Sequence, residues 1–445
     1  MTLIFVLLAI ALIYIAYKYP KQTFIIGLLI LPFHAAIVTF LKSFLGLGNV
    51  SYVILTLWKE FILFGILANI AISRINNKEK LKFEFIDYLI VLFGVLAILV
   101  SLINHIDLKT FIYGIRYDFE IFAVFYVARN LKFNKEEIIS FFKRSFPVVV
   151  AVALFAIIQH FLPNDFLKHL GYQTGEWTPG SVSAFQLIGD TQILRSQSFF
   201  SGPNQLGLFL TSAFIFYLSQ YGLFKKELNS KLLIGLLLLV LIALVFTFSR
   251  SAWIILIAGI ILIAFNHFKK YWLNITIFIA MFVVLLIPLF FSNNIVSENK
   301  IINNYVLHQG STQERIDRFN SNLDIFKRNP FGLGAGTSGL AAFTLDSSNK
   351  NIIPENWFLQ IGVEYGYVGL ILYILIIASL IYKTTKSKNQ FAFSGFLIIA
   401  ITSIYSLFLP IWTDAPSNFW IWLMIGLIYI QIPNNQPNEN IKCSN

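Results

Sequence analysis

The sequence predicts an all-α, polytopic integral membrane protein with about twelve or thirteen transmembrane helices. Of its 445 residues, 57% are hydrophobic and only 12% are charged, whereas soluble domains are about half apolar and about a quarter charged. Apolar runs long enough to cross about 30 Å of hydrocarbon recur along the whole chain. The net charge of +11 falls in short clusters between these runs. That pattern is typical of cytoplasmic loops and not of a nucleic-acid-binding face, so no nucleic acid partner is expected.

Thirteen apolar runs are the candidate transmembrane helices. They are residues 2–17, 22–41, 53–73, 86–104, 110–129, 146–162, 203–221, 231–249, 251–267, 272–291, 357–382, 391–410 and 417–432. The first run has no basic segment before it and no small-residue cleavage site after it, so we expect a retained helix and not a cleaved signal peptide. The single cysteine, Cys443, excludes a disulfide framework and a cysteine metal cluster.

Lysine and arginine gather in alternate connections between these runs, and the positive-inside rule assigns those connections to the cytoplasm. The clustered residues are Lys18, Lys21, Arg74, Lys78, Lys80, Lys82, Arg129, Lys132, Lys135, Lys143, Arg144, Lys225, Lys226, Lys231, Lys269, Lys270, Lys383, Lys386 and Lys388. The N-terminus is then outside and the C-terminus inside.

Two long connections, 163–202 and 292–356, fall on the outer side in this topology. The second contains an amphipathic stretch, 312–328, which we expect to form a helix over an outward-opening cavity. The tail 433–445 is polar, and we expect it to be disordered in the cytoplasm.

Ionisable residues within the third and fifth runs are candidate functional groups, because charges in the bilayer interior are costly. Lys59 and Glu60 lie in the third run, and Arg116, Asp118 and Glu120 lie in the fifth. All five fall in the outer half of the membrane in this topology. We interpret them as part of an outward-facing polar funnel in which Lys59 and Arg116 bind substrate. The competing interpretation is that Lys59–Glu60 and Arg116–Glu120 are structural ion pairs.

The eleventh run carries a polar stripe of Asn356, Gln360 and Glu364 at a spacing of four residues, which places them on one helix face. The stripe could contact substrate or join helices, with nearby glycines permitting close approach. His34, in the second run, is better explained as a hydrogen-bonded core histidine than as a catalytic one.

Three segments carry more specific information: Arg195–Gly207, Phe246–Trp253 with Arg250 at its centre, and Arg315–Gly369. Together they resemble the O-antigen ligase and O-antigen polymerase superfamily over roughly 190–370. The ligase motif is histidine, then Asn, Ser or Gln, then nine residues, then Gly-x-x-Gly. Asn356 and the glycine pair fit this motif, whereas Glu355 stands where the ligases have histidine.

The resemblance implies a glycosyltransferase of the GT-C type, related to the SEDS peptidoglycan polymerases. Its donor would be an oligosaccharide on undecaprenyl diphosphate, and its acceptor a glycan, a lipid or a protein. The reaction would take place at the outer face of the bacterial cytoplasmic (inner) membrane, among membrane lipids.

Arg195 and Arg250 match the family arginines that hold the diphosphate, a role suited to guanidinium groups, and Arg315 matches a further one. Glu355 takes the place of the catalytic base, with Asn356 and Gln360 beside it as substrate-binding residues. Two plainer interpretations remain open: Arg250 could snorkel to the interface, and Glu355 could orient a loop or pair with an arginine.

Direct displacement at the anomeric carbon would invert its configuration. The chain has no Asp-x-Asp or His-rich cluster, so we expect neither a metal nor a cofactor. The glutamate in place of histidine favours a polymerase over a lipid A–core ligase. Three alternatives stay open: a protein O-oligosaccharyltransferase of the same fold, a catalytically inactive scaffold, and a lipid-linked glycan transporter. A transporter would show broken helices at mid-membrane and polar residues in both leaflets.

Overall fold

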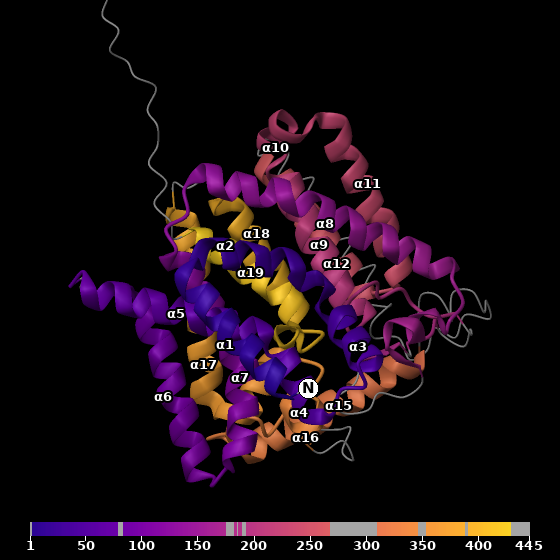
Figure 1. The fold of residues 1–445 in the computed structure, drawn as a ribbon. Coiled ribbons are helices and arrows are strands. Elements are labelled where there is room, and N and C mark those ends of the chain that lie inside the picture. The colour runs from indigo at the N-terminus through magenta and orange to yellow at the C-terminus, as the bar shows by residue number, and fades with distance from the viewer. Residues whose placement is uncertain are drawn as a thin grey trace, which may run out of the picture.

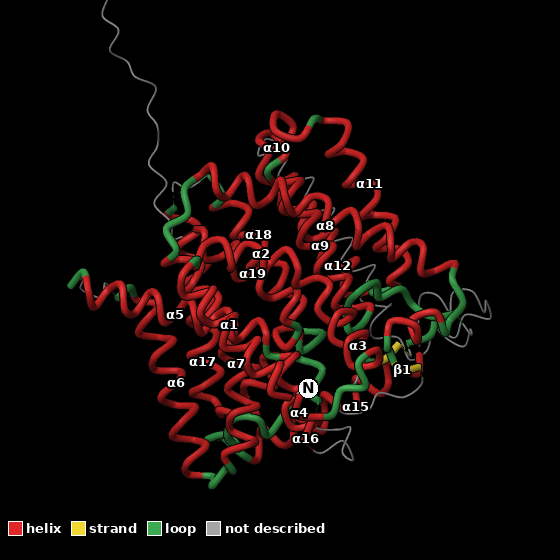
Figure 2. The backbone as a smooth tube through the Cα atoms, in the orientation of Figure 1, coloured by secondary structure: helices red, strands yellow, loops and turns green. Residues whose placement is uncertain are grey.

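The computed structural model describes residues 2–78, 83–174, 182–184, 186–188, 193–267, 309–345, 353–387 and 390–428. Helices dominate these ranges (Figure 2), and the only strands within them are β1 (Gln173–Thr174) and β2 (Ser183–Ala184), which pair in parallel. The predicted all-α membrane fold is therefore confirmed. The predicted helix 272–291 and the tail 433–445 lie outside the described residues.

Every other predicted span coincides with a helix. The helices up to residue 170 are α1 (Thr2–Lys18), α2 (Pro20–Ile30), η1 (Leu31–Phe33), α3 (His34–Phe44), α4 (Asn49–Thr56), α5 (Trp58–Asn76), α6 (Phe85–Ile103), α7 (Leu108–Asn130), α8 (Lys135–Phe161) and η2 (Phe166–Leu170). The later ones are α9 (Pro203–Ser219), α10 (Tyr221–Leu228), α11 (Ser230–Thr247), α12 (Arg250–His267), α15 (Gln309–Arg328), α16 (Gly339–Leu345), α17 (Trp357–Lys386), α18 (Ala392–Ser406), η6 (Ile411–Thr413) and α19 (Ala415–Ile428).

By length and apolar composition alone, 5 of the described helices can cross a membrane, or 7 if each of two bent helix pairs is one span. Three shorter apolar helices are α1, α18 and most of α12. The protein is therefore a multi-pass membrane protein, while the total of twelve or thirteen crossings stays a prediction. The helix α15 covers the stretch where an amphipathic helix was expected.

Ion pairs join the connections that the sequence assigns to the cytoplasm. These pairs are Lys21–Glu137 at 2.8 Å, Arg129–Asp87 at 2.8 Å and Lys383–Glu84 at 2.7 Å. They bring the ends of α2, α6, α7, α8 and α17 together. The two long outer connections contact the predicted outer ends of the eighth and twelfth runs, since the Ser196 amide donates to the Phe246 carbonyl at 3.0 Å and Asn356 donates to the Leu407 carbonyl at 3.0 Å. Both groupings support the predicted alternation of the helices.

The centre of the bundle is α19, drawn in yellow in Figure 1, which packs against α7, α18, α9 and α2. Its indole side chains, Trp420 and Trp422, are fully buried, and Trp420 Nε1 donates to the Leu28 carbonyl at 2.9 Å. In contrast, α6 leaves large apolar side chains such as Leu99 and Leu102 exposed. In a membrane protein such a face contacts lipid.

The helix α17 is broken at Gly366, whose φ of 67° and ψ of −167° are not helical. The loop that follows α15 docks onto the break: Leu333 donates to Val363 at 2.9 Å, Gly334 donates to Glu364 at 2.8 Å, and Tyr367 donates to the Pro330 carbonyl at 3.0 Å, all through backbone groups. These bonds satisfy backbone groups that the break would otherwise leave without partners. The break fixes the position of α15 relative to the start of α17.

A second bend, of 49°, separates α4 from α5 at Leu57. Broken helices were the feature expected of a transporter, and the described helices include these two. Helix breaks therefore do not by themselves separate a transporter from a transferase in this fold.

Candidate functional site

Arg195 lies in the extended segment that leads into α9, and neutral acceptors hold its guanidinium. Nε donates to the Thr247 carbonyl at 2.9 Å, Nη1 donates to Gln186 Oε1 at 2.9 Å, and Nη2 donates to Asn204 Oδ1 at 3.0 Å. Thr247 is the last residue of α11, so these bonds fix Arg195 close to the start of α12, where Arg250 lies. None of the three acceptors carries a charge, so they orient the guanidinium without neutralising it.

Arg250 and Arg315 add two further cations to Arg195. Burial lowers the pKa of Arg195 to about 9, and the charges of Arg315 and Arg250 contribute to the same shift. Arg315 also interacts electrostatically with Arg250. Three segments far apart in the sequence thus meet in one cluster of guanidinium groups, which we call the arginine cluster (Arg195, Arg250 and Arg315). Because Arg195 remains protonated at neutral pH, this cluster is suited to binding an anion with more than one negative charge.

Glu355 stands next to the arginine cluster, before the first turn of α17. Its Oε1 accepts a hydrogen bond from Arg318 Nη1 at 2.9 Å, and its Oε2 lies 3.9 Å from Arg315 Nε. The carboxylate therefore pairs with arginine, which is the plainer of the two interpretations of Glu355 that the sequence allowed; the other is a catalytic base. The 3.9 Å separation exceeds a hydrogen bond, so Oε2 is the oxygen better placed to accept another proton.

The backbone at Glu355 is also unusual, since its φ of 52° lies in the left-handed region. Residues other than glycine, asparagine and aspartate rarely adopt this conformation, and it recurs at functional sites. The conformation turns the chain sharply into α17 and so sets the direction of the carboxylate.

Asn356 and Gln360 have well-defined structural positions. Asn356 caps α17, because its Oδ1 accepts a hydrogen bond from the Leu359 amide at 2.9 Å. Gln360 is 1% exposed, and its side-chain amide packs against Gly339. The contact is so close that a Cβ added to Gly339 would lie 2.2 Å from Gln360 Oε1. Contact between either residue and a substrate stays a prediction.

Lys59 and Arg116 belong to a partly buried ion network between α5 and α7. Lys59 Nζ pairs with Glu60 and, at 3.0 Å, with Glu120, while Arg116 pairs with Glu60 at 2.7 Å. The predicted pair of Arg116 with Glu120 is not among these contacts, because Arg116 reaches across to α5. Two cations match two anions here, and this geometry favours the structural interpretation.

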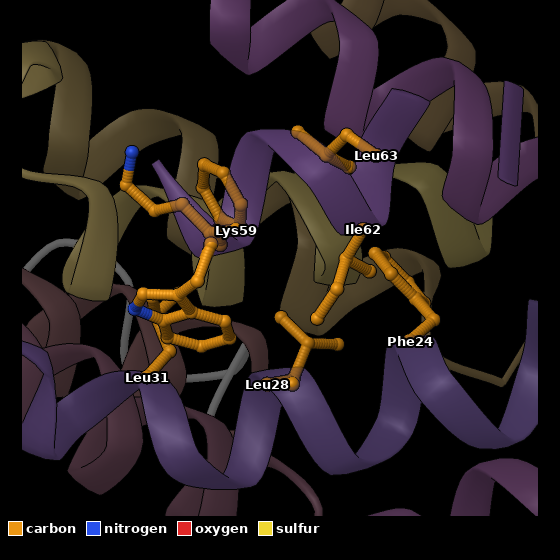
Figure 3. A pocket seen from close by; sticks show the side chains of 9 residues that line it. Phe24, Leu28, Leu31, Lys59, Ile62 and Leu63 are labelled. Atoms are coloured by element: carbon orange, nitrogen blue, oxygen red, sulfur yellow. The ribbon is translucent and has the colours of Figure 1, made fainter. Parts of the chain in front are cut away.

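A small apolar pocket lies beside this network, and Figure 3 shows Lys59 at its edge with the amino group directed away from Leu28 and Ile62. His34 accepts a hydrogen bond from Trp58 Nε1 at 2.8 Å. His34 is therefore a hydrogen-bonded core histidine, the interpretation that the sequence analysis preferred over a catalytic one.

Asp414 is a buried acidic residue near the site that the sequence analysis did not identify. It lies between η6 and α19, where its Oδ1 accepts from Ser201 Oγ at 3.2 Å and its Oδ2 accepts from Ser417 Oγ at 2.8 Å. Burial raises the pKa of Asp414. Its position as an acidic residue in a short apolar outer connection was the signal that could have revealed it.

The Tyr405 hydroxyl donates to the Asn204 carbonyl at 2.9 Å, and the side chain of the same asparagine accepts from Arg195. Among the described residues, no group of three or more His, Cys, Asp or Glu side chains is placed to hold a metal ion.

Comparison with known proteins gives three matches. A family model described as O-antigen ligase matches residues 235–374. An O-antigen polymerase from Salmonella muenchen is 26% identical over 300 residues, which cover 64% of this chain and 72% of that protein. A ComP-specific O-oligosaccharyltransferase from Acinetobacter baylyi is 27% identical over 390 residues, which cover 82% of this chain and 65%, slightly less than two thirds, of that protein.

Proposed function

The resemblance to the O-antigen ligase and polymerase superfamily is confirmed, and from it we propose that this protein transfers an oligosaccharide from undecaprenyl diphosphate to a glycan or lipid acceptor. The reaction takes place at the outer face of the bacterial cytoplasmic membrane. The observation that carries the proposal is the meeting of Arg195, Arg250 and Arg315 beside Glu355.

The arginine cluster binds the donor diphosphate. Guanidinium groups form paired, charge-assisted hydrogen bonds with phosphate oxygens and keep their charge at neutral pH. When the sugar–phosphate bond breaks, negative charge grows on the leaving diphosphate. Cations already fixed in place stabilise that charge without reorganisation, and the contacts of Arg195 with Thr247, Gln186 and Asn204 fix it in this way.

Glu355 acts as the general base. An acceptor hydroxyl oxygen attacks the anomeric carbon, the bond from that carbon to the diphosphate oxygen breaks, and the hydroxyl proton passes to Glu355 Oε2. The products are the extended glycan and undecaprenyl diphosphate. A single displacement inverts the anomeric configuration. Because arginines supply the positive charge, the reaction proceeds without a metal ion.

A second candidate function is protein O-oligosaccharyltransferase activity, in which the acceptor is a serine or threonine hydroxyl. The match to the Acinetobacter transferase favours it, since this match extends over 82% of the chain. Donor binding and the base would be the same in both reactions, so only the acceptor separates them.

The test is transfer by the purified protein in liposomes, supplied with an undecaprenyl-diphosphate-linked oligosaccharide and an acceptor glycan. Arg195→Ala and Arg250→Ala should abolish product while the protein remains folded and inserted. Arg74→Ala is the matched control, because Arg74 contacts Asn130 at the opposite end of the bundle. Chelation with EDTA should leave the rate unchanged.

Products of increasing length would identify a polymerase, and a single addition to lipid would identify a ligase. Normal transfer in both arginine-cluster variants would overturn the donor-binding role. Movement of the intact donor across the bilayer without any transfer would identify a transporter.

A further inference from the structure

A pair of buried carboxyl groups, Asp118 on α7 and Glu364 on α17, has no part in the proposed reaction. Asp118 is 1% exposed and Glu364 is 0% exposed, and the two carboxyl groups lie close enough to interact directly with each other. Within the described part of the chain, neither forms an ion pair with lysine or arginine. Two buried carboxylates in contact would repel each other strongly and would both lack their water shell.

Two of the four carboxyl oxygens have ordinary donors. Tyr365 Oη donates to Asp118 Oδ2, and the Ser338 amide donates to Glu364 Oε1 at 3.1 Å. The other two, Asp118 Oδ1 and Glu364 Oε2, are buried without a donor in the described structure. One proton between these two oxygens would satisfy both at once, since a protonated carboxyl donates and the ionised one accepts.

The carboxyl pair lies where it contacts the loop that docks onto the break in α17. Glu364 lies next to the break at Gly366, and its backbone carbonyl accepts from Gly334 at 2.8 Å while its side chain accepts from Ser338. Glu364 therefore holds both the loop that follows α15 and the start of α16. Asp118 anchors that arrangement to α7. The same loop connects to α15, which carries Arg315 and Arg318, and α17 begins beside Glu355.

We propose that Asp118 and Glu364 share one proton and act as positioning residues, holding the loop–helix junction that places Arg315 and Arg318 against Glu355. The junction loses this support when one member of the pair can no longer donate or accept the hydrogen bond between them. The positioning role rests on the proposed function, whereas the shared proton does not.

Infrared spectroscopy of the purified protein at neutral pH tests the shared proton directly. Asp118→Asn and Glu364→Gln each replace one carboxyl by an amide, whose N–H can donate to the remaining carboxylate. Each variant should therefore lose the carbonyl absorption of a protonated carboxylic acid relative to the native protein. Asp87→Asn is the control, since Asp87 forms an ion pair with Arg129 at 2.8 Å; its difference spectrum should show the loss of a carboxylate only.

Difference spectra without loss of a protonated acid in Asp118→Asn and Glu364→Gln would overturn the proposal. A carboxylate absorption that shifts when sodium and potassium are replaced by a large organic cation would also overturn it, because a bound cation would then take the place of the proton.

The positioning role is tested by transfer in the liposome assay. Asp118→Asn should keep transfer within about threefold of the native rate, whereas Asp118→Ala, which leaves Glu364 buried without its partner, should lose at least about tenfold. Equal rates in the two variants would exclude the positioning role. If the native protein transfers nothing, the proposed function fails, and the infrared result still decides the shared proton.

Discussion

Gly366→Ala should destabilise the protein strongly, because the break in α17 requires a residue without a side chain. The backbone at Gly366 has a φ of 67° and a ψ of −167°, a region that almost only glycine occupies and that costs other residues about 1–3 kcal/mol. A Cβ would also lie 2.3 Å from the Pro330 carbonyl oxygen and 2.6 Å from the Phe331 carbonyl carbon. Both contacts are with backbone, so the docked loop must move. We expect a loss of at least about 3 kcal/mol of unfolding free energy.

The assay is thermal unfolding of the protein in detergent, followed by size-exclusion chromatography of the fraction that remains folded. Gly235→Ala is the matched control, because nothing lies within 4 Å of a Cβ at this position in α11. In a helix interior, alanine is favoured over glycine by up to about 1 kcal/mol, so this variant should unfold at or above the native temperature. Equal unfolding of Gly366→Ala and the native protein would refute the reasoning about the break.

Other substitutions test the remaining contacts. Lys59→Met removes the cation that pairs with Glu120 and one of the two that pair with Glu60, and it should cost about 3–5 kcal/mol. Lys143→Met, in an exposed pair, should change the unfolding temperature little. Similar unfolding of the two variants would count against a structural network. Arg195→Lys should lower transfer at least about tenfold, because one ammonium group cannot replace three fixed hydrogen bonds, and native activity would show that the fixed geometry is dispensable. A cysteine at Leu187, in a Cys443→Ser background, should react with an impermeant reagent from outside; reaction only from the cytoplasm would invert the topology.

The fold was largely predictable from sequence because the helices follow directly from apolar runs in a lipid solvent. The break in α17 was not predictable in the same way. It depends on a positive φ at Gly366 and on hydrogen bonds from the loop around Pro330, and these contacts exist only when α15 and α17 are already placed. The motif placed glycine at this position, but the physical reason lies in the docked loop.

The sequence singled out the charged side chains of α5 and α7 that meet in the ion network, but not all of their partners. The spacing of Arg116 and Glu120 predicts a local pair on one helix face, whereas the structure pairs Arg116 with Glu60 on α5. The choice between the two depends on how α5 and α7 pack, which a single sequence does not give. The partner of Asp414 could not be predicted for the same reason, since its contact with Ser201 joins residues 213 positions apart.

The arginine cluster was expected from a resemblance, because composition and spacing cannot bring Arg195, Arg250 and Arg315 together. In the structure their charges act on one another, and Arg318 pairs with Glu355 at 2.9 Å. The role of each residue in transfer stays a proposal until it is measured.

The most direct measurement is the affinity of the purified protein for an undecaprenyl-diphosphate-linked oligosaccharide, compared with Arg250→Ala and Glu355→Gln. If the cluster holds the diphosphate and the carboxylate only removes a proton, Arg250→Ala should bind at least about tenfold more weakly. Glu355→Gln should bind like the native protein and still transfer nothing. Native affinity in Arg250→Ala, or full transfer by Glu355→Gln, would contradict the account.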